Sequence, residues 1–116
     1  MAKTITRLEL QDKIAGPARP ILLEALPAKY FLDGHLPGAV HMPHDKVRAL
    51  AGAVVPDKDA EIVVYCASAT CQNSHIAAST LEQLGYRKVG VYAGGKQDWV
   101  EAGLPLEKGG NVQDAA

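Results

Sequence analysis

Apolar and polar positions along the chain predict strands separated by helices. Two short apolar runs rich in β-branched residues, EIVVYC (61–66) and KVGVYA (88–93), are typical of buried strands. The run PILLEAL (20–26) predicts a third strand, although it contains a glutamate, and GAVHMP (38–43) is long enough only for a strand. The chain therefore carries at least four candidate strands.

Helical signals lie between these runs. Thr6 and Glu9 have the spacing of a capping box, which predicts a short helix that stops before Gly16 and Pro17. Pro27 suits the first turn of a helix closed by Gly34. Apolar residues at helical spacing predict a long helix from Ser74 until Gly85, and two short helices are expected at 44–51 and 96–103. We expect Tyr86 and Trp99 to serve in packing.

Alternating strands and helices imply an α/β fold, with a mostly parallel sheet and helices on both faces. We expect one domain over residues 1–108 and a flexible C-terminal tail over 109–116 (GGNVQDAA). Open parallel sheets bind ligands outside the carboxyl ends of their strands, and Cys66 lies at such an end.

Composition narrows the function classes. The chain has 116 residues, 47% of them apolar and 22% charged, as in an ordinary globular domain. Its net charge of -1 does not point to nucleic acid or an anionic membrane as a partner. We find no apolar segment long enough to span a bilayer and no signal peptide, and we expect a cytoplasmic protein. Two cysteines are too few for a disulfide framework, which favours reactive or ligating thiols.

Cys66 begins a loop that runs from a strand into a helix. Such a loop points successive backbone N–H groups inward, and the first helical turn adds unpaired donors and a positive dipole end. This arrangement stabilises an anion, here the thiolate of Cys66, without a charged side chain. The alternative is that Cys66 is only a small buried apolar residue. The expected binding loop consists of Ala67, Ser68, Ala69, Thr70, Cys71, Gln72 and Asn73.

Five short motifs in order give the chain a family resemblance. They are GHLPGA (34–39), YC (65–66), LGY (84–86), GG (94–95) followed by Trp99, and AGLP (102–105). Over Ile21 to Glu107 the sequence resembles the single-domain rhodanese sulfurtransferases, including a subgroup with two cysteines in the loop. The resemblance implies a five-stranded parallel sheet. It also implies that Cys66 takes a sulfane sulfur from thiosulfate, polysulfide or a persulfide and passes it to a thiol or cyanide, without a metal or cofactor. A protein sulfur acceptor is a further possible partner.

The sequence departs from this family at two arginines. Asn73 stands at the position of the usual loop arginine, in a loop that is longer than the family's. Glu24-Ala25-Leu26 replaces the usual Asp-Val-Arg, so a second arginine is absent. Backbone donors alone would then hold a dianionic donor such as thiosulfate, which makes thiosulfate a doubtful substrate.

Cys71, five residues after Cys66, is a candidate resolving thiol. Its attack on a Cys66 persulfide would release sulfide and leave a disulfide, provided that the Cα atoms lie within about 7 Å. This would be the chemistry of a thiol-redox or sulfide-sensing module. Alternatively, Cys71 only lines the pocket or points into the core.

Three other interpretations stay open. A phosphatase or arsenate reductase also uses a cysteine in an anion-binding loop, although Gln72 stands where phosphatases need an arginine. A metal site would draw on Cys66, Cys71 and His75, beside His41 and His44, but lacks the paired spacing of zinc motifs. A non-catalytic binding module is the third.

Two further residues are candidates for a supporting role at the site. Glu24 is expected to orient loop N–H groups or a tyrosine hydroxyl, to act on the thiol by its charge, or simply to hold the next loop. His35 is expected to be a hydrogen-bonded structural histidine. His75, in the first turn of its helix, is expected to be exposed.

Overall fold

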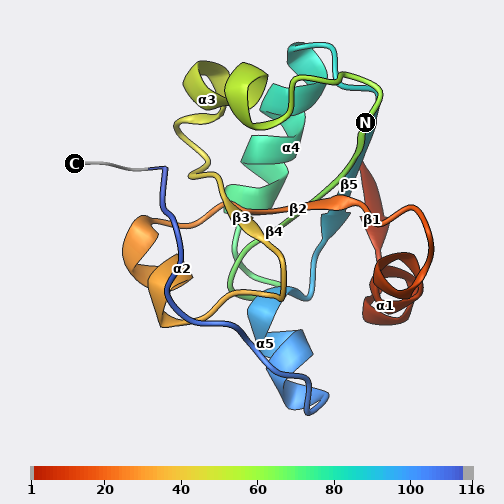
Figure 1. Ribbon diagram of the computed structural model, residues 1–116, viewed down its shortest axis with the longest axis vertical. Coiled ribbons are helices and arrows are strands. Elements are labelled where there is room, and N and C mark those ends of the chain that lie inside the picture. The colour runs from red at the N-terminus through yellow and green to blue at the C-terminus, as the bar shows by residue number, and fades with distance from the viewer. Residues whose placement is uncertain (1, 114–116) are drawn as a thin grey trace.

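The computed structural model describes residues 2–113. Its centre is a five-stranded sheet in the order β1-β5-β4-β2-β3 (Figure 1), and every neighbouring pair is parallel. The α/β class expected from the sequence is therefore confirmed. The strands are β1 (Lys3–Ile5), β2 (Ile21–Glu24), β3 (Val40–His41), β4 (Glu61–Tyr65) and β5 (Lys88–Tyr92).

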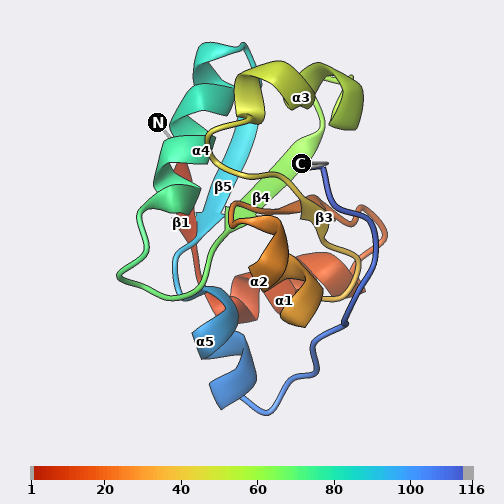
Figure 2. The same cartoon turned by 90° about the vertical axis from the view of Figure 1, so that its left-hand side faces the viewer.

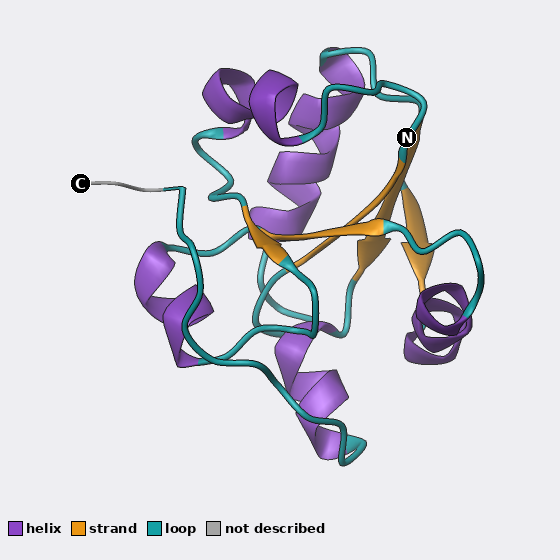
Figure 3. Cartoon of the chain, in the orientation of Figure 1, coloured by secondary structure: helices purple, strands orange, loops and turns teal. Residues whose placement is uncertain are grey.

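Helices connect the strands, as Figure 3 shows. They are α1 (Arg7–Ala15), α2 (Ala28–Asp33), α3 (Val47–Val54), α4 (Asn73–Gln83) and α5 (Gly95–Glu101). The capping box at the start of α1 is present, with Thr6 and Glu9 each bonding the other's backbone N–H. The helix expected at 44–51 begins later, because Lys46 N–H bonds Pro43 O and residues 43–46 form a turn.

Helices cover both faces of the sheet (Figures 1 and 2). Along β4, Ile62 and Val64 pack into a core that also holds buried residues of α3 and α4. Val63 and Tyr65 face the other way, into a core shared with Leu10 of α1 and Trp99 of α5. This alternation follows from the two-residue period of a strand, and it places Tyr65 on the α1 and α5 side.

Tyr86 and Trp99 are packing residues, as expected. Tyr86 is buried, and its hydroxyl donates to Ala51 O at 3.0 Å on α3. Trp99 is buried, and its indole N–H donates to Pro105 O at 2.8 Å. Each side chain thereby fixes a helix or loop to the body of the domain.

The two ends of the chain add detail that local patterns did not predict. β1 lies at an edge of the sheet, beside β5. Residues 109–113, expected to belong to a tail, contact the body: Gly109 N–H donates to Leu32 O at 2.9 Å, and Gln113 N–H donates to Nδ1 of His41 at 3.0 Å. Residues 114–116, the rest of that tail, lie outside the described residues. Flexibility of 109–116 stays a prediction.

Candidate active site around Cys66

Cys66 follows β4 directly, at the carboxyl edge of the sheet and before the loop that leads to α4. Only 1% of its surface is exposed. Ser74, in the first turn of α4, is equally buried, and its hydroxyl oxygen lies 3.4 Å from Sγ of Cys66. A buried sulfur therefore lies beside a hydroxyl donor and near the positive end of a helix dipole.

Cys66 and Cys71 form a disulfide, with their Cα atoms 6.3 Å apart. A turn brings them together, because Cys71 N–H bonds Ser68 O at 3.1 Å. Cys71 is partly exposed, unlike Cys66. The loop whose sequence spacing made it a candidate for a thiol pair thus has the geometry that such a pair needs.

The start of the loop offers several unused backbone donors. Within residues 2–113, the N–H groups of Ala67, Ser68, Ala69 and Thr70 donate no hydrogen bond to another protein group. The hydroxyl groups of Ser68 and Thr70 bond each other at 3.1 Å. No residue from 66 to 73 is charged. Unused N–H groups in a loop can bind an anion, as expected from the sequence for this loop.

The N-terminus of α5 holds the other side of the loop. Lys96 N–H donates to Cys66 O at 3.0 Å, and Gln97 N–H donates to Ala67 O at 2.9 Å. Gly95 makes this approach possible, with a φ of +64° and with Cys66 O only 2.5 Å from the position that a Cβ would occupy. Any other residue there would be strained in its backbone and would collide with the loop.

A buried polar cluster of Glu24, Tyr65 and Lys96 lies beside the start of the loop. The Tyr65 hydroxyl donates to one carboxylate oxygen of Glu24 at 2.8 Å and accepts from Leu36 N–H at 3.0 Å. The Lys96 ammonium donates to the other Glu24 oxygen at 3.1 Å. Two carbonyls of the α2 region, Tyr30 O at 2.9 Å and Gly34 O at 2.8 Å, accept its other bonds. All three protons of this ammonium are therefore used.

Burial dominates the electrostatics of this cluster. It raises the pKa of Glu24, and the Lys96 ammonium and the Tyr65 hydroxyl offset only part of that rise. Burial likewise raises the pKa of Tyr65, and the neighbouring Glu24 carboxylate raises it further, so the phenol stays a hydrogen-bond donor. Glu24 thus orients a tyrosine hydroxyl, which is one of the roles considered for it from the sequence.

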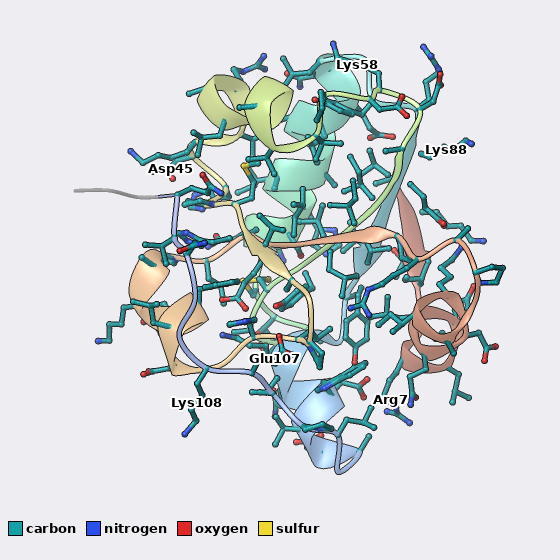
Figure 4. All side chains as sticks on the ribbon, in the orientation of Figure 1. Arg7, Asp45, Lys58, Lys88, Glu107 and Lys108 are labelled. Atoms are coloured by element: carbon teal, nitrogen blue, oxygen red, sulfur yellow. A yellow bond between two sulfur atoms is a disulfide. The ribbon has the colours of Figure 1, made fainter. Side chains whose placement is uncertain are left out.

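A cavity of about 380 Å³ opens beside the loop. Its lining residues come from several segments, and they are Tyr30, Asp33, Gly34, Ala67, Lys96, Gln97, Val100 and Leu106. Figure 4 shows Lys58 and Lys88 away from α5, whereas Arg7 and Lys108 lie toward the same end of the molecule as α5. The exposed surface of this cavity is mainly apolar, although Asp33, Lys96 and Gln97 also line it.

The histidines have separate surroundings. His35 is buried, stacks on Phe31 with ring centroids 3.9 Å apart, and has Nδ1 2.9 Å from Phe31 O. His41 is also buried and bonds Leu26 O at 2.6 Å, whereas His75 is exposed as expected. Within residues 2–113, no group of three or more His, Cys, Asp or Glu side chains is arranged to hold a metal ion. The structure therefore does not bring the histidines to the cysteine pair.

Sequence reasoning missed Lys96 and Gly95. From the sequence, the pair Gly94-Gly95 indicated only a turn. Glycine can also mark a place where another backbone segment comes close, and that was the available signal for Gly95. Lys96 gave no signal, because an isolated lysine in a short helix is usually solvated. The cue that existed was Glu24, since a carboxylate in a buried strand requires a partner from elsewhere in the chain.

Comparison with known proteins places this architecture in a family. Residues 6–102 match the rhodanese-like domain. The HTH-type transcriptional regulator Rv0324 of Mycobacterium tuberculosis is 32% identical over 109 residues, which cover 93% of this chain and 46% of that protein. The putative sulfur carrier protein YrkF of Bacillus subtilis is 30% identical over 101 residues, which cover 84% of this chain and 52% of that protein.

Solved structures agree with the sequence match. A thiosulfate sulfurtransferase from Pseudomonas aeruginosa superposes with a TM-score of 0.82 at 25% identity, over 92% of this chain and 20% of that one. The chain belongs to the rhodanese-like domain family. It spans about half the length of the curated relatives described above. No helix within residues 2–113 is long and apolar enough to cross a membrane.

Proposed function

We propose that this domain is a sulfurtransferase in which Cys66 carries the transferred sulfur as a persulfide. The observation that carries the proposal is the position of the buried Cys66 sulfur, 3.4 Å from the Ser74 hydroxyl oxygen at the start of α4, in a loop whose first N–H groups are unused. Membership of the rhodanese-like family, and similarity to a thiosulfate sulfurtransferase and a putative sulfur carrier protein, support sulfurtransferase activity in general.

The reaction has two displacement steps once the disulfide is reduced. The Cys66 thiolate attacks the sulfane sulfur of a donor, and the remainder of the donor leaves with the bonding electron pair. An acceptor thiol or cyanide then attacks the outer sulfur of the persulfide, and Cys66 leaves as a thiolate. Within the expected loop, the Cys71 N–H already bonds Ser68 O, so the unused N–H groups of Ala67, Ser68, Ala69 and Thr70 are the donors for the negative charge that Cys66 carries before and after each step.

The charge distribution favours persulfide or polysulfide donors over thiosulfate. The loop has no cationic side chain, and the three ammonium protons of Lys96 already bond Glu24, Tyr30 and Gly34. Thiosulfate, a dianion, would be held by backbone N–H groups alone. A singly charged sulfur donor carries less negative charge for those N–H groups to stabilise. The apolar lining of the adjacent cavity supports the same preference. A thiol, on a small molecule or a protein, is the acceptor that we infer.

The other interpretations of the sequence receive less support. A phosphatase or arsenate reductase would need an arginine in the loop, and residues 66–73 contain none. A pure binding module could use the same unused donors, and membership of the rhodanese-like family is what favours sulfur transfer over it. Cytoplasmic location stays a prediction.

Mass spectrometry of the reduced protein tests the proposal. After brief treatment with polysulfide, or separately with thiosulfate, we expect a Cys71→Ser protein to gain the mass of one sulfur atom on Cys66. A Cys66→Ser/Cys71→Ser protein is the matched control and should gain none. Polysulfide should load the protein faster than thiosulfate. Absence of the adduct with every donor, in a correctly folded Cys71→Ser protein, would overturn the proposed function.

A further inference from the structure

The cysteine pair occupies the place where the proposed intermediate would form. In the disulfide, Sγ of Cys71 is bonded to Sγ of Cys66. A sulfane sulfur on Cys66 would be bonded to the same atom. The Cys71 sulfur and a transferred sulfur are therefore alternative bonding partners of the same atom, Sγ of Cys66.

We propose that this domain has a second activity, the reductive cleavage of its own persulfide with release of sulfide, and that Cys71 is the catalytic residue for it. The proposal rests on the proposed function, because it begins from the Cys66 persulfide. It defines the domain as a persulfide reductase that works with a dithiol, in addition to passing sulfur to an acceptor.

The step balances in atoms and electrons. The Cys71 thiolate attacks Sγ of Cys66, so an S–S bond forms between the two cysteines. The bond from Cys66 to the sulfane sulfur breaks, and its electron pair leaves with that sulfur as hydrosulfide, which takes up a proton. The sulfane sulfur is reduced by two electrons, and the two cysteine thiols are oxidised to the disulfide.

The local geometry favours this internal attack over attack by an outside thiol. Cys66 is 1% exposed, whereas Cys71 is already inside the same loop, with its Cα 6.3 Å from that of Cys66. The turn from Ser68 to Cys71 keeps it there. Because the attacking and attacked sulfurs belong to one loop, the step needs no bimolecular encounter and has a high effective concentration.

The same asymmetry explains how the pair is reset. An external dithiol must attack one sulfur of the disulfide, and the partly exposed Cys71 is the more accessible one. Cys66 then leaves as a thiolate next to the Ser74 hydroxyl, 3.4 Å away, and near the start of α4. A stabilised leaving group accelerates thiol–disulfide exchange. The second thiol of the reductant resolves the mixed disulfide on Cys71 and restores both cysteines.

A single-turnover experiment without external thiol tests the proposal. The wild-type chain is reduced, freed of reductant and given one equivalent of polysulfide sulfur. We expect it to release about one equivalent of hydrosulfide and to end two hydrogen masses below the reduced chain. Cys71→Ser and Cys71→Ala should keep the added sulfur atom and release hydrosulfide about tenfold more slowly or worse.

A control with the same number of thiols isolates the position of Cys71. Ser79 is exposed on α4, so the double variant Cys71→Ser/Ser79→Cys moves the second thiol out of the loop. It should behave like Cys71→Ser, and circular dichroism checks that each variant folds. Release by the double variant at the wild-type rate would overturn the role of Cys71.

The outcomes separate this inference from the proposed function. If the wild-type chain gains sulfur and retains it as firmly as Cys71→Ser does, the reductase activity is excluded and sulfur transfer stands. If neither chain gains sulfur, the proposed function itself fails. With an added dithiol such as dithiothreitol, the wild-type chain should turn over repeatedly, and Cys66→Ser should not.

Discussion

Two groups of residues adjoin Cys66 and differ in charge and in how their hydrogen-bonding groups are used. The loop from 67 to 73 has no charged side chain and presents unused backbone N–H groups. The cluster of Glu24, Tyr65 and Lys96 pairs a buried carboxyl with a partly buried ammonium, and their hydrogen bonds are made within the protein. The loop is free to bind a ligand, whereas the cluster is not. Under the proposed function, the charged side chains would fix the shape of the site and the loop backbone would recognise the sulfur donor.

Lys96 joins the two groups, because its backbone binds the loop and its ammonium completes the cluster. Lys96→Met leaves the Glu24 carboxyl buried without its cation. We expect the largest loss of stability here, about 3 to 5 kcal/mol in the free energy of unfolding measured by urea denaturation. Lys88→Met, at an exposed lysine, is the control and should change little. If both variants lost the same free energy of unfolding, the ion pair between Lys96 and Glu24 would make no specific contribution to stability.

Gly95 tests whether the loop depends on a close backbone approach. In Gly95→Ala, the positive φ costs about 1 to 2 kcal/mol, and contact with Cys66 O adds about 1 to 3 kcal/mol of overpacking. Gly103→Ala is a matched control, since Gly103 also has a positive φ, +82°, but nothing within 4 Å of its added Cβ. The melting temperature of Gly95→Ala should therefore be clearly lower than that of Gly103→Ala. Equal melting temperatures would contradict the close approach of Gly95 to Cys66 O.

Ser74 tests whether a hydroxyl at the start of α4 stabilises the Cys66 thiolate. We make Ser74→Ala in a Cys71→Ser chain so that a single thiol reacts. Loss of a hydrogen bond to a charged group costs about 1.5 to 3 kcal/mol, so alkylation of Cys66 by iodoacetamide at neutral pH should slow about tenfold or more. Ser79→Ala, exposed on the same helix, should leave the rate as it is. An undiminished rate in Ser74→Ala would mean that its hydroxyl does not support the thiolate.

Glu24 gives the smallest expected effect, and it depends on pH. Burial raises the pKa of this carboxyl above its ordinary value of 4.5, so the folded state binds the proton more tightly than the unfolded state. The wild-type chain should therefore lose stability as pH rises from about 4.5 through the folded-state pKa. The loss is about 1.4 kcal/mol for each tenfold difference in proton affinity between the folded and unfolded states. Glu24→Gln cannot ionise and should lack that decline in urea titrations at several pH values. Parallel pH profiles for the two proteins would rule out this linkage.

Much of the architecture was predictable because it follows from local patterns. β4 and β5 are apolar runs with β-branched residues, and α1 and α4 carry a capping box and helical spacing. β1 was not predicted by these patterns, because three residues, Lys3–Ile5, give no detectable periodicity. Its strand conformation depends on pairing with β5, which is distant in the sequence.

The sequence by itself determined the α/β fold and the place of Cys66 at the carboxyl end of a buried strand, because both depend on patterns within a few residues. Only the tertiary structure decided that Lys96 pairs with Glu24, that Gly95 lets α5 contact the loop, and that the two cysteines are joined. The first two of these depend on distances between segments far apart in the chain, and the third on the turn that the loop adopts.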